Sequence, residues 1–89
     1  MAHLICRHQV KDYDAWREVY DSVQGLRSDK GEVSDIVYRD DADGTQVTLV
    51  QEWKSLDHAR AFMDDPGLKD AMAKAGVVGA PTFHFVEKA

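Results

Sequence analysis

His8 is the residue of this sequence best suited to acid–base chemistry, and it lies two positions after the only cysteine, Cys6. Residues two apart in a strand point to the same face, so the two side chains would share one environment. Near neutral pH an imidazole can act as a general base or hold a phenol or carbonyl. We therefore predict that His8 is the catalytic residue and general base if the protein is an enzyme. The alternative is a partly buried histidine bonded to the backbone.

Cys6 is a weaker candidate for chemistry. A nucleophilic cysteine needs a cationic neighbour that lowers its pKa, whereas a small buried thiol needs no special environment. We therefore favour a buried structural role for Cys6. A single cysteine also excludes a disulfide within the chain.

The remaining histidines, His3, His58 and His84, do not form a metal-binding pattern. No two histidines have the HxH or HxxxH spacing, and His3 and His8 would face opposite sides of a strand. The loop Asp40–Gly44 is rich in aspartate but lacks the closing glutamate of a calcium loop. We predict no metal site.

Aromatic side chains at helical spacing could line a pocket for a planar ligand. The same spacing is equally typical of a plain hydrophobic core. The residues concerned are Tyr13, Trp16, Tyr20, Trp53 and Phe62.

The first half of the chain predicts a strand, a helix and a hairpin. Residues 3–10 alternate as a strand, and Asp12 can cap a helix that runs to about Gln24. Gly25 is predicted to end this helix, and Leu26–Gly31 to form a polar connection. Strands over 33–39 and 45–53, joined by an Asp-Gly turn, form the hairpin. Because the second of these strands is apolar on both faces, we expect the hairpin in the middle of the sheet.

The second half predicts two short helices and a last strand. Ser55 can cap a helix with Ala59, Phe62 and Met63 inside, and Asp65-Pro66 starts another that ends at Gly76. Val77–Pro81 is expected as an exposed linker before a strand over 82–87. The order β-α-β-β-α-β predicts a ferredoxin-like α+β fold with a four-stranded antiparallel sheet.

Size and charge limit the classes of partner. Eighty-nine residues predict a single domain over residues 1–89, with a net charge of −5 and no basic cluster. We therefore expect neither nucleic acid nor a membrane surface as a partner.

Arg7 and His8 interrupt any signal peptide, so a cytoplasmic protein is expected. Helices can cover one face of the sheet, and we predict that a second copy covers the other, giving a homodimer.

The chain resembles small bacterial proteins of the dimeric α+β barrel superfamily, in the group similar to antibiotic biosynthesis monooxygenases. The resemblance rests on segments 12–16 (DYDAW), 52–53 (EW), 59–62 (ARAF) and 75–77 (AGV), and on Pro81. It implies two sheets that face each other across a dimer, and a ligand pocket between the helices and the sheet of each subunit.

The resemblance also bears on the site and its chemistry. Haem-degrading members of the superfamily place Asn, Trp and His in the pocket, where this chain has Cys6, Phe62 and Met72. These three residues are thus expected to line a pocket that does not degrade haem. Two functions remain open. One is a cofactor-independent monooxygenase, cyclase or isomerase acting on a small hydroxylated aromatic or polyketide-like compound. The other is a non-catalytic dimer that binds an apolar or aromatic ligand or is purely structural.

Overall fold

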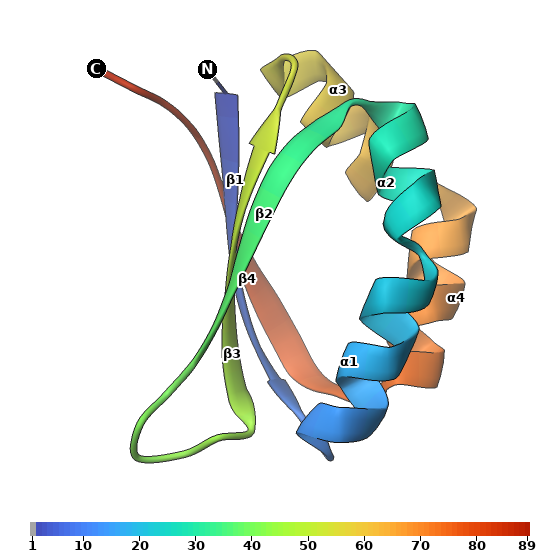
Figure 1. Ribbon diagram of the computed structural model, residues 1–89, viewed down its shortest axis with the longest axis vertical. Coiled ribbons are helices and arrows are strands. Elements are labelled where there is room, and N and C mark those ends of the chain that lie inside the picture. Colours follow the sequence, from blue (N-terminus) through green and yellow to red (C-terminus); the bar gives the residue numbers. More distant parts are fainter. Residues whose placement is uncertain (1) are drawn as a thin grey trace.

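A twisted antiparallel sheet carries all its helices on one face in the computed structural model, which describes residues 2–89 (Figure 1). The spatial order of the strands is β2-β3-β1-β4. This is the ferredoxin-like α+β arrangement that the sequence predicts. The strands are β1 (Ala2–Val10), β2 (Glu32–Arg39), β3 (Gln46–Trp53) and β4 (Val77–Glu87).

The helices begin at side chains that accept hydrogen bonds from their first free amides. Asp12 caps α1, Ser55 caps α3 and Asp65 caps α4, as predicted, and Pro66 takes the first position of α4. Gly76 ends α4 with a positive φ of 76°. The helices are α1 (Tyr13–Ser22), α2 (Gln24–Lys30), α3 (Leu56–Met63) and α4 (Pro66–Ala75).

The predicted polar connection over residues 26–31 is wrong, because the chain forms a further helix there. Gly25 lies inside α2, and the left-handed turn comes instead at Gly31, with φ 114°. The side chain of Arg27 is buried within this helix. A buried tertiary contact therefore outweighs the local preference of glycine for a helix end.

The predicted linker over residues 77–81 is also wrong, because β4 begins at Val77 and pairs with the end of β1. The pairing steps from Arg7–Thr82 to Gln9–Val78, so residues 79–81 stand opposite His8 alone. Gly79 allows this bulge by adopting φ 71°. The bulge lies beside the predicted catalytic residue.

The hairpin is not in the middle of the sheet as a whole. β3 is central and pairs with both β1 and β2, but β2 forms an edge. The face away from the helices carries an apolar row, which we call the outer row and define as Ile36, Val50 and Ile5. Ile36 is 52% exposed. An edge position and an open face therefore leave apolar surface on the sheet uncovered.

The core lies between the sheet and the helices and has two parts. One is formed by α1 with the middle of the sheet, and it contains Trp16 and Tyr20. The other lies under α3 and contains Leu4, Trp53 and Phe62. The inward face of β1 contributes to both parts, so it connects them.

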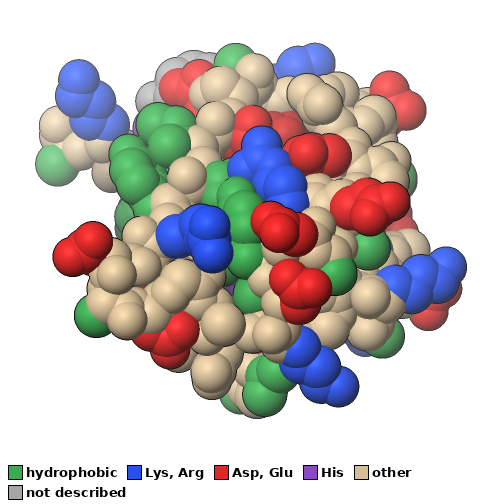
Figure 2. Space-filling view, turned by 60° about the horizontal axis from the view of Figure 1, so that its bottom comes forward, with side chains coloured by type: hydrophobic (Ala, Val, Ile, Leu, Met, Phe, Trp, Pro, Cys, Tyr) green, Lys and Arg blue, Asp and Glu red, His purple; other side chains and the backbone are tan. Residues whose placement is uncertain are grey.

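The surface mixes charges of both signs. On the face drawn in Figure 2, Lys and Arg side chains are scattered among Asp and Glu, with hydrophobic side chains exposed between them. Within residues 2–89, no helix is long and apolar enough to cross a membrane.

Candidate functional site

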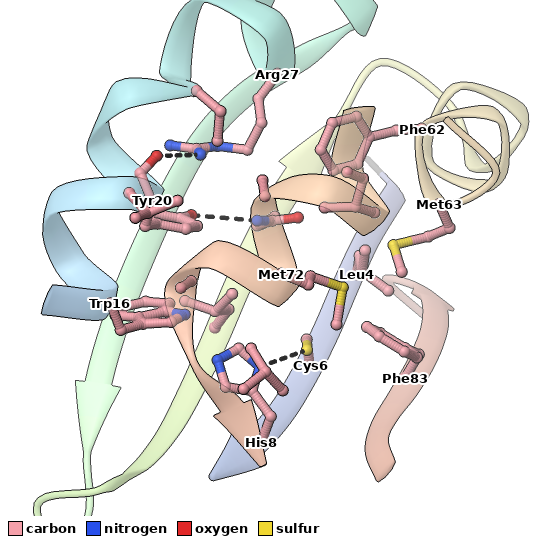
Figure 3. Close-up of a pocket in the computed structure, with 18 residues that line it drawn as sticks. Leu4, Cys6, His8, Trp16, Tyr20, Arg27, Phe62, Met63, Met72 and Phe83 are labelled. Carbon is pink, nitrogen blue, oxygen red and sulfur yellow. Dashed lines mark hydrogen bonds between the residues drawn. The ribbon is translucent and has the colours of Figure 1, made fainter. Parts of the chain in front are cut away.

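A cavity of about 70 Å³ lies between the helical layer and the inner face of the sheet (Figure 3). Its wall is mainly apolar, with polar groups from β1, α1, α2 and β3. The residues that line it are Leu4, Cys6, His8, Trp16, Val19, Tyr20, Val23, Arg27, Leu49, Gln51, Phe62, Met63, Leu68, Ala71, Met72, Ala75, Val77 and Phe83.

His8 and Cys6 form a contact at one end of this cavity. Both project from the inner face of β1, and the Sγ atom of Cys6 lies 3.4 Å from Nδ1 of His8 (Figure 3). Burial raises the pKa of the Cys6 thiol to about 12, so the sulfur stays protonated at neutral pH. Burial also lowers the pKa of His8 below 6.5. The pair is therefore neutral at pH 7.

The second nitrogen of His8 has no partner. Only 7% of His8 is exposed, and its Nε2 atom is buried without a hydrogen bond. The imidazole ring lies 5.4 Å from the Trp16 ring, tilted by 59°. Because buried polar atoms are nearly always paired, an orphan nitrogen in a cavity wall marks a place for a ligand atom.

Arg27 forms a buried charged group at the other end of the cavity. Its Nε donates to Glu32 at 3.1 Å, its Nη1 donates to the carbonyl of Tyr20 at 2.7 Å, and its guanidinium lies 3.7 Å from the Tyr20 ring centre. Desolvation raises the pKa of Glu32, while the charge of Arg27 acts to lower it. The guanidinium of Arg27 is therefore paired at this end of the cavity. Of the side-chain atoms of Arg27 and Glu32 that are fully buried, only Oε2 of Glu32 lacks a hydrogen-bond partner.

A chain of hydrogen bonds continues from this end into the sheet. The Tyr20 hydroxyl donates to Asp35 at 2.6 Å and accepts from Gln51 at 3.2 Å. Gln51 in turn accepts from the indole of Trp53 at 3.2 Å. Burial and the bond to Asp35 raise the pKa of Tyr20, so its hydroxyl stays protonated. These groups position one another, and none of their buried side-chain nitrogen or oxygen atoms lacks a partner.

The structure brings most of the predicted site residues together. Cys6, His8, Trp16, Tyr20, Phe62 and Met72 all line the cavity.

Tyr13 and Trp53 were expected in the same wall but lie elsewhere. Tyr13 is at the start of α1, where the guanidinium of Arg39 covers its ring at 3.9 Å. Trp53 is fully buried behind Phe62, with ring centres 5.1 Å apart, and its indole nitrogen is bonded to Gln51. Both are core residues that support the wall from outside.

The sequence predictions missed Arg27 and Gln51. Gln51 shares the inner face of β3 with Val47 and Leu49, so strand alternation could have found it. Arg27 carried no such signal, because its burial depends on the unexpected helix α2.

No metal centre is formed by the residues that the structure describes: nowhere in 2–89 do three His, Cys, Asp or Glu side chains gather as ligands would. The chemistry on offer is a mainly apolar space with one neutral imidazole at one end. Such an imidazole can bind the ionisable oxygen of a small molecule.

Comparison with protein-family models gave a match. The family model described as antibiotic biosynthesis monooxygenase matches residues 8–74. A search of curated protein sequences gave no match.

Many solved structures share the fold. A putative antibiotic biosynthesis monooxygenase from Bordetella bronchiseptica superposes with a TM-score of 0.82 at 15% identity, over 99% of this chain and 96% of the other. SnoaB, a cofactor-independent oxygenase from Streptomyces nogalater, gives 0.76 at 13%, over 99% and 94%. A conserved protein from Methanosarcina mazei gives 0.79 at 14%, over 99% and 92%. At these identities the likeness shows the fold alone.

Proposed function

Since this chain belongs to the antibiotic biosynthesis monooxygenase family, we propose that its cavity binds a small hydroxylated aromatic or polyketide-like compound and oxygenates it. The same site would serve the related cyclisation or isomerisation of such a compound. The reaction uses no added cofactor, as in the similarly folded SnoaB, whose name describes a cofactor-independent oxygenase.

One observation carries the proposal: the unpaired Nε2 atom of His8 in the wall of an otherwise apolar cavity. An imidazole that is neutral at pH 7 can take the proton of a phenol or hold the oxygen that remains. A water-poor environment strengthens this contact because charges are screened less there. His8 is therefore the proposed catalytic residue.

The proposed oxygenation needs only the substrate and O₂. A methylene beside the phenolic ring system loses one proton to solvent, and the resulting carbanion gives its electron pair to O₂ as a carbon–oxygen bond forms. The peroxide then takes up a proton from solvent and loses water, which leaves a carbonyl. One oxygen atom enters the product and the other leaves as water, so the carbon is oxidised and O₂ is reduced.

The cavity must widen to take such a compound. Its volume of about 70 Å³ is well below the roughly 300–1,000 Å³ of typical ligand pockets. Met63 and Met72 line it from α3 and α4, and unbranched methionine side chains repack more easily than other core residues. These two side chains are the proposed adjustable part of the wall.

We also propose that the protein is a homodimer through the sheet face that bears the outer row. Helices α1 to α4 lie on the opposite face, so they cannot cover this apolar surface (Figure 1). An Arg7–Asp40 ion pair and a His3–Glu52 pair flank the row. An apolar centre with polar edges is typical of an interface between identical subunits.

The test is a search for turnover with a matched histidine control. Hydroxylated anthrones, quinols and catechols are incubated with the protein without metal or flavin, and oxygen uptake and ring closure are followed. On any compound turned over, His8→Phe should lower the rate by about a hundredfold or more. His58→Phe makes the same chemical change outside the cavity and should keep the rate.

The outcomes test the role of His8 and distinguish an enzyme from a non-catalytic binding protein. Full activity in a folded His8→Phe variant removes His8 from the mechanism. Tight binding of these compounds without turnover favours a non-catalytic binding protein instead. Circular dichroism in the near ultraviolet checks that both variants are folded.

A further inference from the structure

The surroundings of Cys6 and His8 determine which of the two residues donates the hydrogen bond between them. The two atoms, Sγ and Nδ1, are 3.4 Å apart, and Cys6 is only 4% exposed. A neutral imidazole has one N–H donor and one acceptor, whereas a thiol is a weak donor and a weak acceptor. The direction of this one hydrogen bond therefore decides which ring nitrogen of His8 carries the proton.

The buried thiol keeps its hydrogen, because its raised pKa of about 12 leaves it protonated at pH 7. Nδ1 of His8 is the hydrogen-bond partner that the structure gives to this sulfur. If Nδ1 donated instead, its hydrogen would go to a weak sulfur acceptor and the thiol hydrogen would be unused. The stronger arrangement has the thiol donating to the lone pair of Nδ1, which places the ring proton on Nε2.

The remaining groups of the wall decide what this N–H can bind. Of the polar groups that line the cavity, Tyr20, Arg27 and Gln51 are all engaged in hydrogen bonds. Nε2 of His8 is the unpaired atom among the described lining residues, which include no carboxylate. A buried donor without a partner costs free energy, which an acceptor oxygen on a ligand recovers.

We propose that Cys6 is a positioning residue that keeps the ring proton of His8 on Nε2, so that the cavity recognises its substrate as a phenolate or enolate oxygen. This proposal extends the proposed function, and the class of substrate that it names rests on that function. In the resting protein His8 donates a hydrogen bond to the anion and stabilises it. The proton of the phenol leaves to solvent on binding and is not stored on the imidazole.

The first experiment measures the tautomer directly, without any ligand. Long-range proton–nitrogen correlation NMR of labelled protein distinguishes a protonated from an unprotonated Nδ1. The wild type should show the proton on Nε2, and Cys6→Ser should keep it there because a hydroxyl also donates. Cys6→Ala removes the donor and should shift the population towards a proton on Nδ1. Leu4→Val, which trims the neighbouring position on the same strand face, should leave the tautomer unchanged.

The second experiment measures the binding of 4-nitrophenol, a probe whose phenolate form is coloured. Below the pKa of the free phenol, the bound probe should appear as phenolate. Calorimetry in two buffers of different ionisation enthalpy should show one proton released for each molecule bound. Cys6→Ala should weaken binding by roughly ten- to a hundredfold, the range expected for the loss of a hydrogen bond to a charged group, and Cys6→Ser should restore it.

The outcomes separate this proposal from the proposed function. A wild-type proton on Nδ1, or binding without proton release, overturns the role of Cys6 even if the protein turns over a substrate. Failure of 4-nitrophenol to bind, or its binding as the neutral phenol, overturns the anion preference. If the protein shows the expected tautomer and binds the phenolate but turns over no substrate, the result supports this proposal and contradicts the proposed enzymatic function.

Discussion

The guanidinium of Arg27 lies 3.7 Å from the centre of the Tyr20 ring and donates to the backbone carbonyl of the same residue at 2.7 Å. One side chain thereby joins α2 to α1 through both a ring contact and a hydrogen bond. Its third contact, to Glu32, joins α2 to β2. The polar end of the cavity therefore depends on a residue seven positions after the tyrosine that it supports.

Removal of this arginine should strongly destabilise the protein. Arg27→Met leaves Glu32, whose side chain is 5% exposed, without its partner, and breaking such a buried pair costs about 3–5 kcal/mol. Urea denaturation measures the change in free energy of unfolding. Arg17→Ala breaks an exposed pair with Asp21 and should cost less than about 1 kcal/mol.

A double variant tests the reason for this loss. Arg27→Met combined with Glu32→Leu removes both charges, so most of the lost stability should return. If the double variant is no more stable than Arg27→Met alone, the unpaired carboxylate is not the cause.

The stability of the fold should depend on pH through His8. Burial lowers the folded-state pKa of His8 below the ordinary value of 6.5. At pH values between the folded-state pKa and 6.5, the unfolded chain therefore binds a proton that the folded protein does not. The contribution is fully present above pH 6.5 and is lost as the pH falls through the folded-state pKa. Free energies of unfolding at several pH values should show this loss in the wild type and not in His8→Phe. An identical pH profile in the two proteins would contradict it.

The outer row should be needed for association. Light scattering of the wild type should give about twice the chain mass of 10.0 kDa. Ile36→Asp places a charge on the proposed interface, at a side chain that is 52% exposed in the single chain. It should give a folded protein of single-chain mass. Ala73→Asp, on the exposed side of α4, should remain dimeric. A wild type that is monomeric at micromolar concentration rules out this interface.

Haem should not be degraded. The cavity presents Cys6, Phe62 and Met72 where the resemblance places the asparagine, tryptophan and histidine of haem-degrading proteins. Haemin is titrated into the protein, a reductant is added under air, and the Soret band is followed. We expect no conversion to a bilin, and stoichiometric binding followed by such conversion would contradict the prediction.

Local signals in the sequence predicted local structure well. The caps at Asp12, Ser55 and Asp65 each depend on a side chain and an amide two or three residues away, so their pattern is visible in the sequence. The alternation of β1 likewise placed Cys6 and His8 on its buried face. These signals predicted the order of the elements and placed two of the residues that line the cavity.

The errors all concern contacts between different helices and strands. The start of β4 is determined by pairing with Val10, which is far away in the sequence. α2 continues through Gly25 because Arg27 finds its partners on α1 and β2. Tyr13 and Trp53 have the same residue types as the true wall, and only the packing of the helices on the sheet excludes them. None of these relationships has a period or spacing that a sequence pattern could reveal.

The bulge opposite His8 leaves part of β4 without the constraint of strand pairing. Residues 79–81 have no partner residues in β1, and Pro81 has no amide hydrogen to donate. β4 is also the edge of the sheet, so no further strand holds the segment from the other side. This stretch can move outward without breaking a rung of the ladder. Strand pairing therefore constrains this part of β4 less than the paired stretches on either side of it.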